Sequence, residues 1–296
     1  MTPAAPFGTV LTAMVTPFKE DGSLDLDGVQ RVAKHLVDHG HDGIVVSGTT
    51  GESATTTVAE DAETLAAVKD AVGDRAMVVA GVGTNDTRTT VELAQQAEKL
   101  GVDGLLLVTP YYNKPGQRGI LQHFRQVVDA VATPVMLYDI PGRTGTKIAL
   151  ETFREIAEWG RVLAVKDASG DVTQAVALRE LGFAVYSGDD ALTLGFLAYG
   201  GCGVVSVLGH AAGSQIRAMV DAFLAGDLAT AQQLNTRLQP ALAAVMGAPN
   251  YGATTAKGAL QLLGVLDNRT VRSPLAALDD QEYAALREGL TASGLL

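Results

Sequence analysis

The sequence has little cysteine and no long hydrophobic segment, and both absences limit what the protein can be. Its 296 residues include one cysteine, Cys202, so no intrachain disulfide can form. No uninterrupted apolar stretch is long enough to span a membrane. Residues 1–7 contain neither a basic segment nor an apolar core, so they do not resemble a signal peptide. We therefore expect a globular protein of the cytoplasm.

Positive charge is also scarce. The chain has 22 Lys and Arg against 33 Asp and Glu, and its formal net charge is −11. An acidic surface repels phosphate backbones, and no basic run or basic-aromatic stripe is present, so no nucleic-acid partner is expected. Hydrophobic residues make up 47% of the chain, which is enough to bury a sizeable core and excludes wholesale disorder.

Short apolar runs rich in β-branched residues recur along the chain. Several are apolar at successive positions, which is typical of parallel strands buried on both faces. The expected strands are Val10–Val15, Gly43–Val46, Met77–Ala80, Gly104–Val108, Val135–Tyr138, Val162–Lys166, Ala184–Ser187 and Gly203–Val207.

Amphipathic segments with helical spacing follow each of these runs. The expected helices are Leu26–His39, Val58–Val72, Thr87–Leu100, Gly119–Val131, Leu150–Trp159, Val172–Leu181, Ala191–Tyr199 and Ala211–Ala225. Eight regular βα units favour a (β/α)8 TIM barrel over an open doubly wound sheet. Further helical patterns in residues 227–290 predict a C-terminal helical appendage. We therefore expect a barrel domain over residues 1–225 and a helical domain over residues 226–296.

Catalytic residues of such a barrel lie where the strands end. Lys166 follows four apolar residues and ends the sixth strand, so its ammonium would be buried. Burial lowers the pKa of an amine, and a neutral amine is a nucleophile for carbonyl carbon. The structural alternative, a buried ion pair with Asp167 or Asp189, is about as probable on position alone.

Other strand ends offer groups that suit this chemistry. Tyr138 ends the neighbouring strand, and its phenol can shuttle a proton, although a core tyrosine is a common alternative. Thr49 and Thr50 lie in a turn flanked by glycine whose amides could bind a carboxylate. Arg143 could bind a carboxylate bidentately or form a surface ion pair. The sequence thus predicts an amine, a proton shuttle and carboxylate-binding groups at one end of the barrel.

Metal and cofactor chemistry is poorly supported. Nucleophile-elbow, Walker and dinucleotide-binding motifs are all missing. The histidines fall in or beside predicted helices, away from the strand ends, so we expect solvated side chains and no metal or cofactor. They are His35, His39, His41, His123 and His210.

Five segments, in order and on the expected strands, resemble the dihydrodipicolinate synthase / N-acetylneuraminate lyase family. The resemblance extends from about Thr9 to about Leu263 and implies a (β/α)8 barrel with a C-terminal helical domain. The segments are Gly48–Glu52, Thr109–Pro115, Tyr138–Gly145, Val165–Gly170 and Ser187–Asp190.

The resemblance also implies roles for single residues. Lys166 would form a Schiff base with pyruvate, and Tyr138, Thr50 and Tyr112 would relay protons. In this family the tyrosine that matches Tyr112 is donated across a dimer interface, and the usual assembly is a homotetramer. The remaining matches are binding residues: Thr49 with Thr50 for the pyruvate carboxylate, Arg143 for an aldehyde carboxylate, and the Val205 carbonyl lining the pyruvate site.

Within the family, the chain is most similar to members that condense pyruvate with aspartate semialdehyde in lysine and diaminopimelate biosynthesis. Arg143 and the double threonine favour this activity. Asp139 stands where asparagine is commonest in those members, which weakens the match slightly. The alternatives are a sister lyase or aldolase, such as N-acetylneuraminate lyase or a keto-deoxy-sugar-acid aldolase, and a non-catalytic barrel that binds a keto acid.

Feedback inhibition by lysine is expected to be weak or absent. Lysine-inhibited members carry two histidines and a glutamate at positions that are Val58, Asp61 and Thr89 in this chain. Losing a carboxylate that pairs with the lysine amine should weaken binding. Other positions of that site do match the family, namely Ser53, Ala54, Asn85 and Tyr111.

Overall fold

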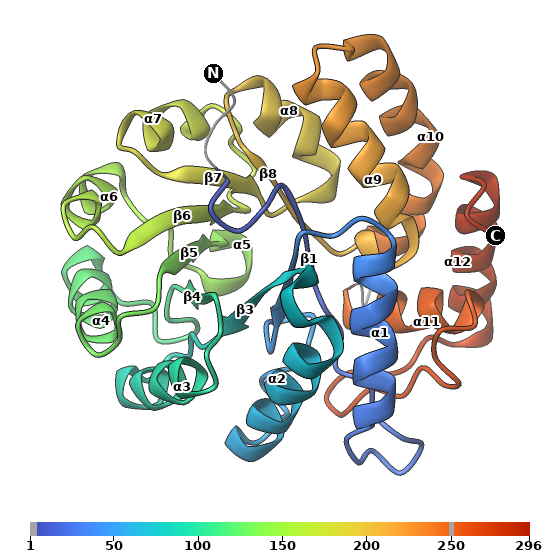
Figure 1. Ribbon diagram of the computed structural model, residues 1–296, viewed down its shortest axis with the longest axis horizontal. Helices are drawn as coiled ribbons and strands as arrows, with labels where there is room; N and C mark the ends of the chain where they lie inside the picture. The colour runs from blue at the N-terminus through green and yellow to red at the C-terminus, as the bar shows by residue number, and fades with distance from the viewer. Residues whose placement is uncertain (1–4, 249–251) are drawn as a thin grey trace. The chain divides into compact units, whose positions relative to one another are not determined.

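The computed structural model describes residues 5–248 and 252–296, and its eight parallel strands form a closed barrel in sequence order (Figure 1). This confirms the predicted (β/α)8 barrel over the open sheet. The strands are β1 (Val10–Ala13), β2 (Gly43–Val46), β3 (Met77–Gly81), β4 (Gly104–Val108), β5 (Val135–Asp139), β6 (Val162–Asp167), β7 (Ala184–Ser187) and β8 (Gly203–Ser206).

Burial explains why these segments form strands. Every residue of β1, β2, β5, β7 and β8 is buried, as the runs of successive apolar residues predict. Strands β5 and β6 extend one residue beyond their predicted ends, to Asp139 and Asp167. Both aspartates are fully buried, so these two strands end on charged side chains inside the protein.

Helices follow the strands in the predicted order. The helices of the barrel units are α1 (Leu26–Asp38), α2 (Val58–Val72), α3 (Thr87–Lys99), α4 (Gln117–Asp129), α6 (Leu150–Ala157), α7 (Gln174–Glu180), α8 (Thr193–Ala198) and α9 (Gly209–Leu224). Side-chain caps define several starts: the Asp86 carboxylate accepts a hydrogen bond from the Thr89 amide, 3.1 Å away, at α3. The short helix α5 (Pro141–Thr144) and the 3-10 turn η1 (Gly73–Arg75) were not expected, and the 3-10 turn η2 (Asp190–Leu192) overlaps the start of the helix expected at Ala191–Tyr199.

The chain divides into two compact units. Unit 1 combines the chain up to Thr9 with Met77–Val205, and unit 2 combines Val10–Ala76 with Ser206–Leu296. Within unit 1, β3 to β8 pair consecutively, and within unit 2, β1 pairs with β2. Unit 2 also holds the three C-terminal helices, and the domain boundary expected after residue 225 stays a prediction. These helices are α10 (Leu228–Met246), α11 (Ala253–Leu262) and α12 (Asp280–Ala292).

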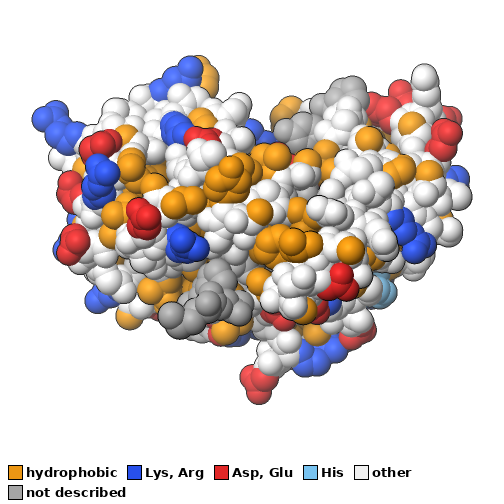
Figure 2. Space-filling view, turned by 90° about the horizontal axis from the view of Figure 1, so that it is seen from above, with side chains coloured by type: hydrophobic (Ala, Val, Ile, Leu, Met, Phe, Trp, Pro, Cys, Tyr) orange, Lys and Arg blue, Asp and Glu red, His pale blue; other side chains and the backbone are white. Residues whose placement is uncertain are grey.

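Charged side chains of both signs lie on the surface. On the face drawn in Figure 2, Lys and Arg side chains are interspersed with Asp and Glu. Among residues 5–248 and 252–296, no helix is long and apolar enough to cross a membrane.

Candidate active site

Lys166 lies at the end of β6 with 4% of its surface exposed. Its Cα is in register with that of Tyr138 on β5 and that of Tyr186 on β7. The Lys166 amine nitrogen lies 4.3 Å from the centroid of the Tyr138 ring. The structure therefore brings together the predicted amine and the predicted proton shuttle, from adjacent strands of unit 1.

Burial makes the Lys166 amine easier to deprotonate. Desolvation lowers the pKa of Lys166 to about 8; the Asp190 carboxylate opposes this shift, and the Arg143 guanidinium reinforces it. Among the described residues, the carboxylate that acts on the charge of Lys166 is that of Asp190 and not one of the two expected at the sequence level, Asp167 and Asp189. The electrostatic role of Asp190 was missed at the sequence level, although Asp190 ends one of the family segments.

Gly188, directly after β7, leaves room for the Lys166 side chain. A Cβ built on Gly188 would lie 2.9 Å from the Ala168 Cβ, which is too close, and 3.1 Å from Cγ of Lys166, which is a tight contact. The Gly188 amide donates to the Asp167 carbonyl at 2.7 Å, which fixes this close approach of the two strand ends. The glycine therefore leaves room for the aliphatic part of the Lys166 side chain.

Two carboxyl groups lie directly after the catalytic candidates. Asp139 and Asp167 are neighbours in the register of β5 and β6. Oδ1 of Asp139 accepts a hydrogen bond from the Ile148 amide at 3.2 Å, whereas its buried Oδ2 has no partner. Burial, and then the charge of Asp167, raise the pKa of Asp139 to about 7. The Ile148 bond closes the loop that contains Arg143.

The other predicted residues of unit 1 differ in exposure. Arg143 lies exposed on α5, which begins with Pro141 and ends at Gly145 in the left-handed region (φ 73°). Tyr112, in the loop after β4, has φ 72° and a 90% exposed surface. Val205 is buried on β8.

Thr49 and Thr50 lie in a tight turn of unit 2, after β2. The Glu52 amide donates to the Thr49 carbonyl at 3.1 Å, and the Ser53 amide donates to the Gly48 carbonyl at 3.3 Å. Thr49 is exposed and Thr50 is 9% exposed. The turn therefore holds two consecutive threonines, of which the first is exposed and the second is buried.

A buried ion pair follows this turn. Lys257 on α11, ambiguous in the sequence, lies 2.5 Å from the Glu52 carboxylate, and both side chains are 1% exposed. Desolvation lowers the pKa of Lys257 to about 8, opposed by Glu52. The direct contact with the Glu52 carboxylate favours the charged form of Lys257, so this lysine is the weaker candidate for a nucleophile.

The prediction of solvated histidines is wrong for three of the five. His41, His123 and His210 are at most 4% exposed. His41 contacts the Thr12 hydroxyl at 2.7 Å, and His210 accepts from the Val15 amide at 3.1 Å. Within the described part of the chain, no group of three or more His, Cys, Asp or Glu residues is arranged to hold a metal.

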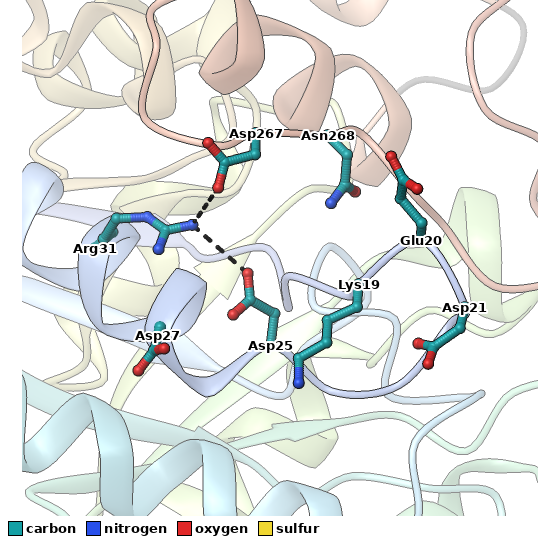
Figure 3. Close-up of a pocket in the computed structure, with 8 residues that line it drawn as sticks. All are labelled: Lys19, Glu20, Asp21, Asp25, Asp27, Arg31, Asp267 and Asn268. Atoms are coloured by element: carbon teal, nitrogen blue, oxygen red, sulfur yellow. Dashed lines mark hydrogen bonds and ion pairs between the residues drawn. The ribbon is translucent and has the colours of Figure 1, made fainter.

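A surface hollow of unit 2 lies between the segment before α1 and the segment after α11 (Figure 3). Arg31 forms ion pairs there with Asp267 (3.2 Å) and Asp25 (3.6 Å). Its other lining residues are Lys19, Glu20, Asp21, Asp27 and Asn268. No predicted catalytic residue lines this hollow, so we do not assign the reaction to it.

Comparison with known proteins gives a consistent result. The model of the dihydrodipicolinate synthetase family matches residues 6–293. A 4-hydroxy-tetrahydrodipicolinate synthase of Acidothermus cellulolyticus is 56% identical over 98% of this chain and 94% of its own length. The lysine-bound enzyme of Cyanidioschyzon merolae superposes with a TM-score of 0.95 at 42% identity, over 99% of this chain and 100% of that one. The pyruvate complex of the Acinetobacter baumannii enzyme superposes with a TM-score of 0.93 at 33% identity, over 99% and 100%.

Proposed function

We propose that this chain, which belongs to the dihydrodipicolinate synthetase family, condenses pyruvate with aspartate semialdehyde to 4-hydroxy-tetrahydrodipicolinate through a Schiff base on Lys166. Relatives that are 46–56% identical over nearly the whole chain are 4-hydroxy-tetrahydrodipicolinate synthases. They favour this activity over a sister lyase or aldolase and over a non-catalytic barrel. The activity belongs to lysine and diaminopimelate biosynthesis.

The observation that supports the mechanism is the buried Lys166 amine beside the Tyr138 ring. A neutral amine attacks C2 of pyruvate, and the resulting carbinolamine loses water to give an iminium. The iminium accepts electrons as the methyl group loses a proton, which produces an enamine. The enamine carbon attacks the aldehyde of aspartate semialdehyde, and the amino group of that substrate then displaces Lys166 as the ring closes.

Proton transfers need a relay in contact with the reacting oxygens and nitrogen. Tyr138 is suited to this role by its place beside Lys166, and Thr50 by its hydroxyl in the turn after β2. The family resemblance adds the partner subunit's Tyr112 as the third member. Tyr112 is 90% exposed within one chain, which suits a side chain that acts in a neighbouring subunit.

Charged and polar groups would hold the two carboxylates. We assign the binding of the pyruvate carboxylate to Thr49 and Thr50. The Val205 carbonyl would line the pyruvate site, and Arg143 would bind the carboxylate of the aldehyde substrate. A guanidinium binds a carboxylate bidentately, so Arg143 suits that role. The assembly that supplies Tyr112 would be a homotetramer built from dimers, located in the cytoplasm.

Borohydride trapping tests the Schiff base directly. Incubation with pyruvate and borohydride, followed by peptide mass mapping, should place a reduced adduct on Lys166. Lys257 is a matched internal control, because it is buried and has a similarly lowered pKa. An adduct on Lys257, or none, would contradict the mechanism.

Substrate choice needs a second assay. Turnover should be observed with pyruvate and aspartate semialdehyde, and cleavage of N-acetylneuraminate should be negligible. The reverse preference would assign the chain to the sister lyases, even if the adduct on Lys166 is found.

A further inference from the structure

The turn that contains Thr49 and Thr50 has an unusual backbone at both ends. Ser47 has φ 56° and Glu52 has φ 58°. Residues with a Cβ rarely adopt this left-handed conformation, because Cβ approaches the following carbonyl oxygen. Such a turn persists only when surrounding contacts hold it, so the contacts of Glu52 matter for the geometry of the threonines.

The Glu52 carboxylate is bound entirely by the C-terminal part of unit 2. Its Oε1 accepts from the Lys257 ammonium at 2.5 Å, and its Oε2 accepts from the backbone amide of Arg272 at 2.9 Å. Lys257 donates a second bond to the Thr270 carbonyl at 2.8 Å. Its nitrogen also lies 4.2 Å from the ring centroid of Phe18. The ion pair of Glu52 and Lys257 is therefore enclosed by protein, and each charge is compensated by the other.

The Arg272 side chain holds the chain just beyond the turn. Its guanidinium donates to the Thr55 carbonyl at 2.8 Å and to the Glu60 carboxylate at 2.5 and 3.0 Å. The middle of the turn is confined as well, because a Cβ on Gly51 would lie 3.1 Å from the Met14 carbonyl. Contacts of unit 2 thus fix both the middle and the exit of the turn.

We infer that Glu52 and Lys257 are positioning residues for pyruvate: their ion pair holds the Gly48–Glu52 turn so that it presents Thr49 and Thr50 to the substrate carboxylate. The inference rests on the proposed function. Neither residue needs to touch the substrate. If the pair served only the stability of the fold, its loss would lower the melting temperature and leave pyruvate binding in the folded protein unchanged.

Two single variants test the pair. Glu52→Gln keeps the size and an acceptor oxygen, and Lys257→Met keeps the length of the side chain without its charge. We expect each to raise the KM for pyruvate, and the pyruvate concentration that half-saturates trapping at Lys166, by about ten-fold. Because carboxylate binding is lost from ground and transition states alike, kcat should fall less. The KM for aspartate semialdehyde should stay within about two-fold, since Arg143 belongs to unit 1.

A lone buried charge can unfold a protein, so the double variant Glu52→Gln/Lys257→Met, which leaves no unpaired charge, is measured as well. We expect a raised pyruvate KM with a melting temperature closer to that of the wild type. Asp267→Asn is the matched control, because it removes an exposed ion pair to Arg31 without contacting the turn. It should retain the wild-type KM.

The outcomes separate two kinds of failure. A wild-type pyruvate KM in the folded double variant would overturn the inference and leave the proposed reaction intact. No pyruvate adduct on the wild-type protein would overturn the Schiff base, and the positioning role with it.

Discussion

A lysine attacks a carbonyl only through its neutral amine, and the environment of Lys166 favours that form. Burial lowers its pKa to about 8. The nearby Asp190 limits the shift, so the amine is not neutral throughout the physiological range. Adduct formation should therefore depend steeply on pH.

We expect the rate of trapping with pyruvate to rise about ten-fold per pH unit below the pKa of Lys166 and to level off above about pH 8. Below this pKa most of the amine is protonated, and above it nearly all is neutral. Borohydride quenching across this range gives the profile, with Lys166→Ala as the variant without adduct. A rate that is independent of pH would contradict the assignment of the titrating amine.

Single residues could be predicted when their position in a strand decided their environment. Lys166 follows an apolar run, so its burial could be expected from the sequence. The influence of the Asp190 carboxylate on Lys166 could not be predicted, because Asp190 follows another strand. The prediction of solvated side chains was wrong for His41 and His210. Amphipathic spacing does not reveal that the Thr12 hydroxyl and the Val15 amide lie within hydrogen-bond distance of their rings.

At the scale of elements, the ends of β5 and β6 place two carboxyl groups side by side. The pKa of Asp139 is raised to about 7, above its value near 3.8 in an unfolded chain. Ionisation is therefore easier after unfolding, and the fold loses stability as pH rises from about 4 through 7. Removing this carboxyl should matter most at alkaline pH.

We expect Asp139→Asn to raise the free energy of unfolding by about 2 kcal/mol at pH 8 and to change it far less at pH 4. An asparagine still accepts from the Ile148 amide, so the loop with Arg143 should stay closed. Urea unfolding at the two pH values measures the difference. An equal effect at both would show that Asp139 does not titrate in this range.

Two of the positions on which the expected response to lysine rests, Asp61 and Thr89, lie on the helices α2 and α3. Asp61 accepts from the Thr56 hydroxyl at 2.9 Å, and Thr89 donates to the capping Asp86, so both side chains serve local structure. We expect millimolar lysine to leave most of the activity, measured with both substrates. Half-maximal inhibition well below that concentration would contradict this.

Elements were predicted well where periodicity is strong. Strand starts agreed with the structure, because runs of buried β-branched residues leave few alternatives. The four-residue helix α5 was missed because it is too short to show helical periodicity. It nevertheless contains Arg143, so the least predictable element holds the residue on which the aldehyde assignment most depends.

At the scale of the whole molecule, the role proposed for the exposed Tyr112 would make activity depend on assembly. We expect Lys166→Ala and Tyr112→Phe each to have little activity, and a mixture of the two, unfolded and refolded together, to regain about a quarter. In a mixed dimer, one site combines an intact Lys166 with the partner subunit's Tyr112. No recovery in refolded mixed dimers would contradict action across an interface.

Acid stability is also a property of the whole fold. Burial lowers the pKa of His41 to about 4 and that of His210 to about 3, against about 6.5 in an unfolded chain. Stability from these neutral rings is complete above about pH 6.5 and is lost as pH falls toward 4, by about 1.4 kcal/mol per pH unit for each histidine. Urea unfolding between pH 7.5 and 5 should show this decline, partly offset by the opposite contribution of Asp139. The exposed His39→Gln should retain it, and a flat profile would contradict it.

The barrel could be predicted from the count of βα units, but its grouping into compact units could not. Unit 2 joins Val10–Ala76 to Ser206–Leu296, and no local pattern signals such distant partners. The same reason hid the Glu52–Lys257 pair, whose members are 205 positions apart. Local sequence patterns predict helices and strands. The contacts that hold a turn can come from residues far away in the sequence, which local patterns do not reveal.

That separation has a consequence for synthesis. A ribosome adds about 5–20 residues per second, so Glu52 is added to the chain roughly 10–40 seconds before Lys257. During this interval the turn with Thr49 and Thr50 lacks the ion pair between Glu52 and Lys257. A nascent chain that already contains Lys166 would therefore bind pyruvate poorly. If the pair positions the turn as inferred, substrate binding would be acquired late in translation, and a truncated product that ends before α11 would not bind pyruvate.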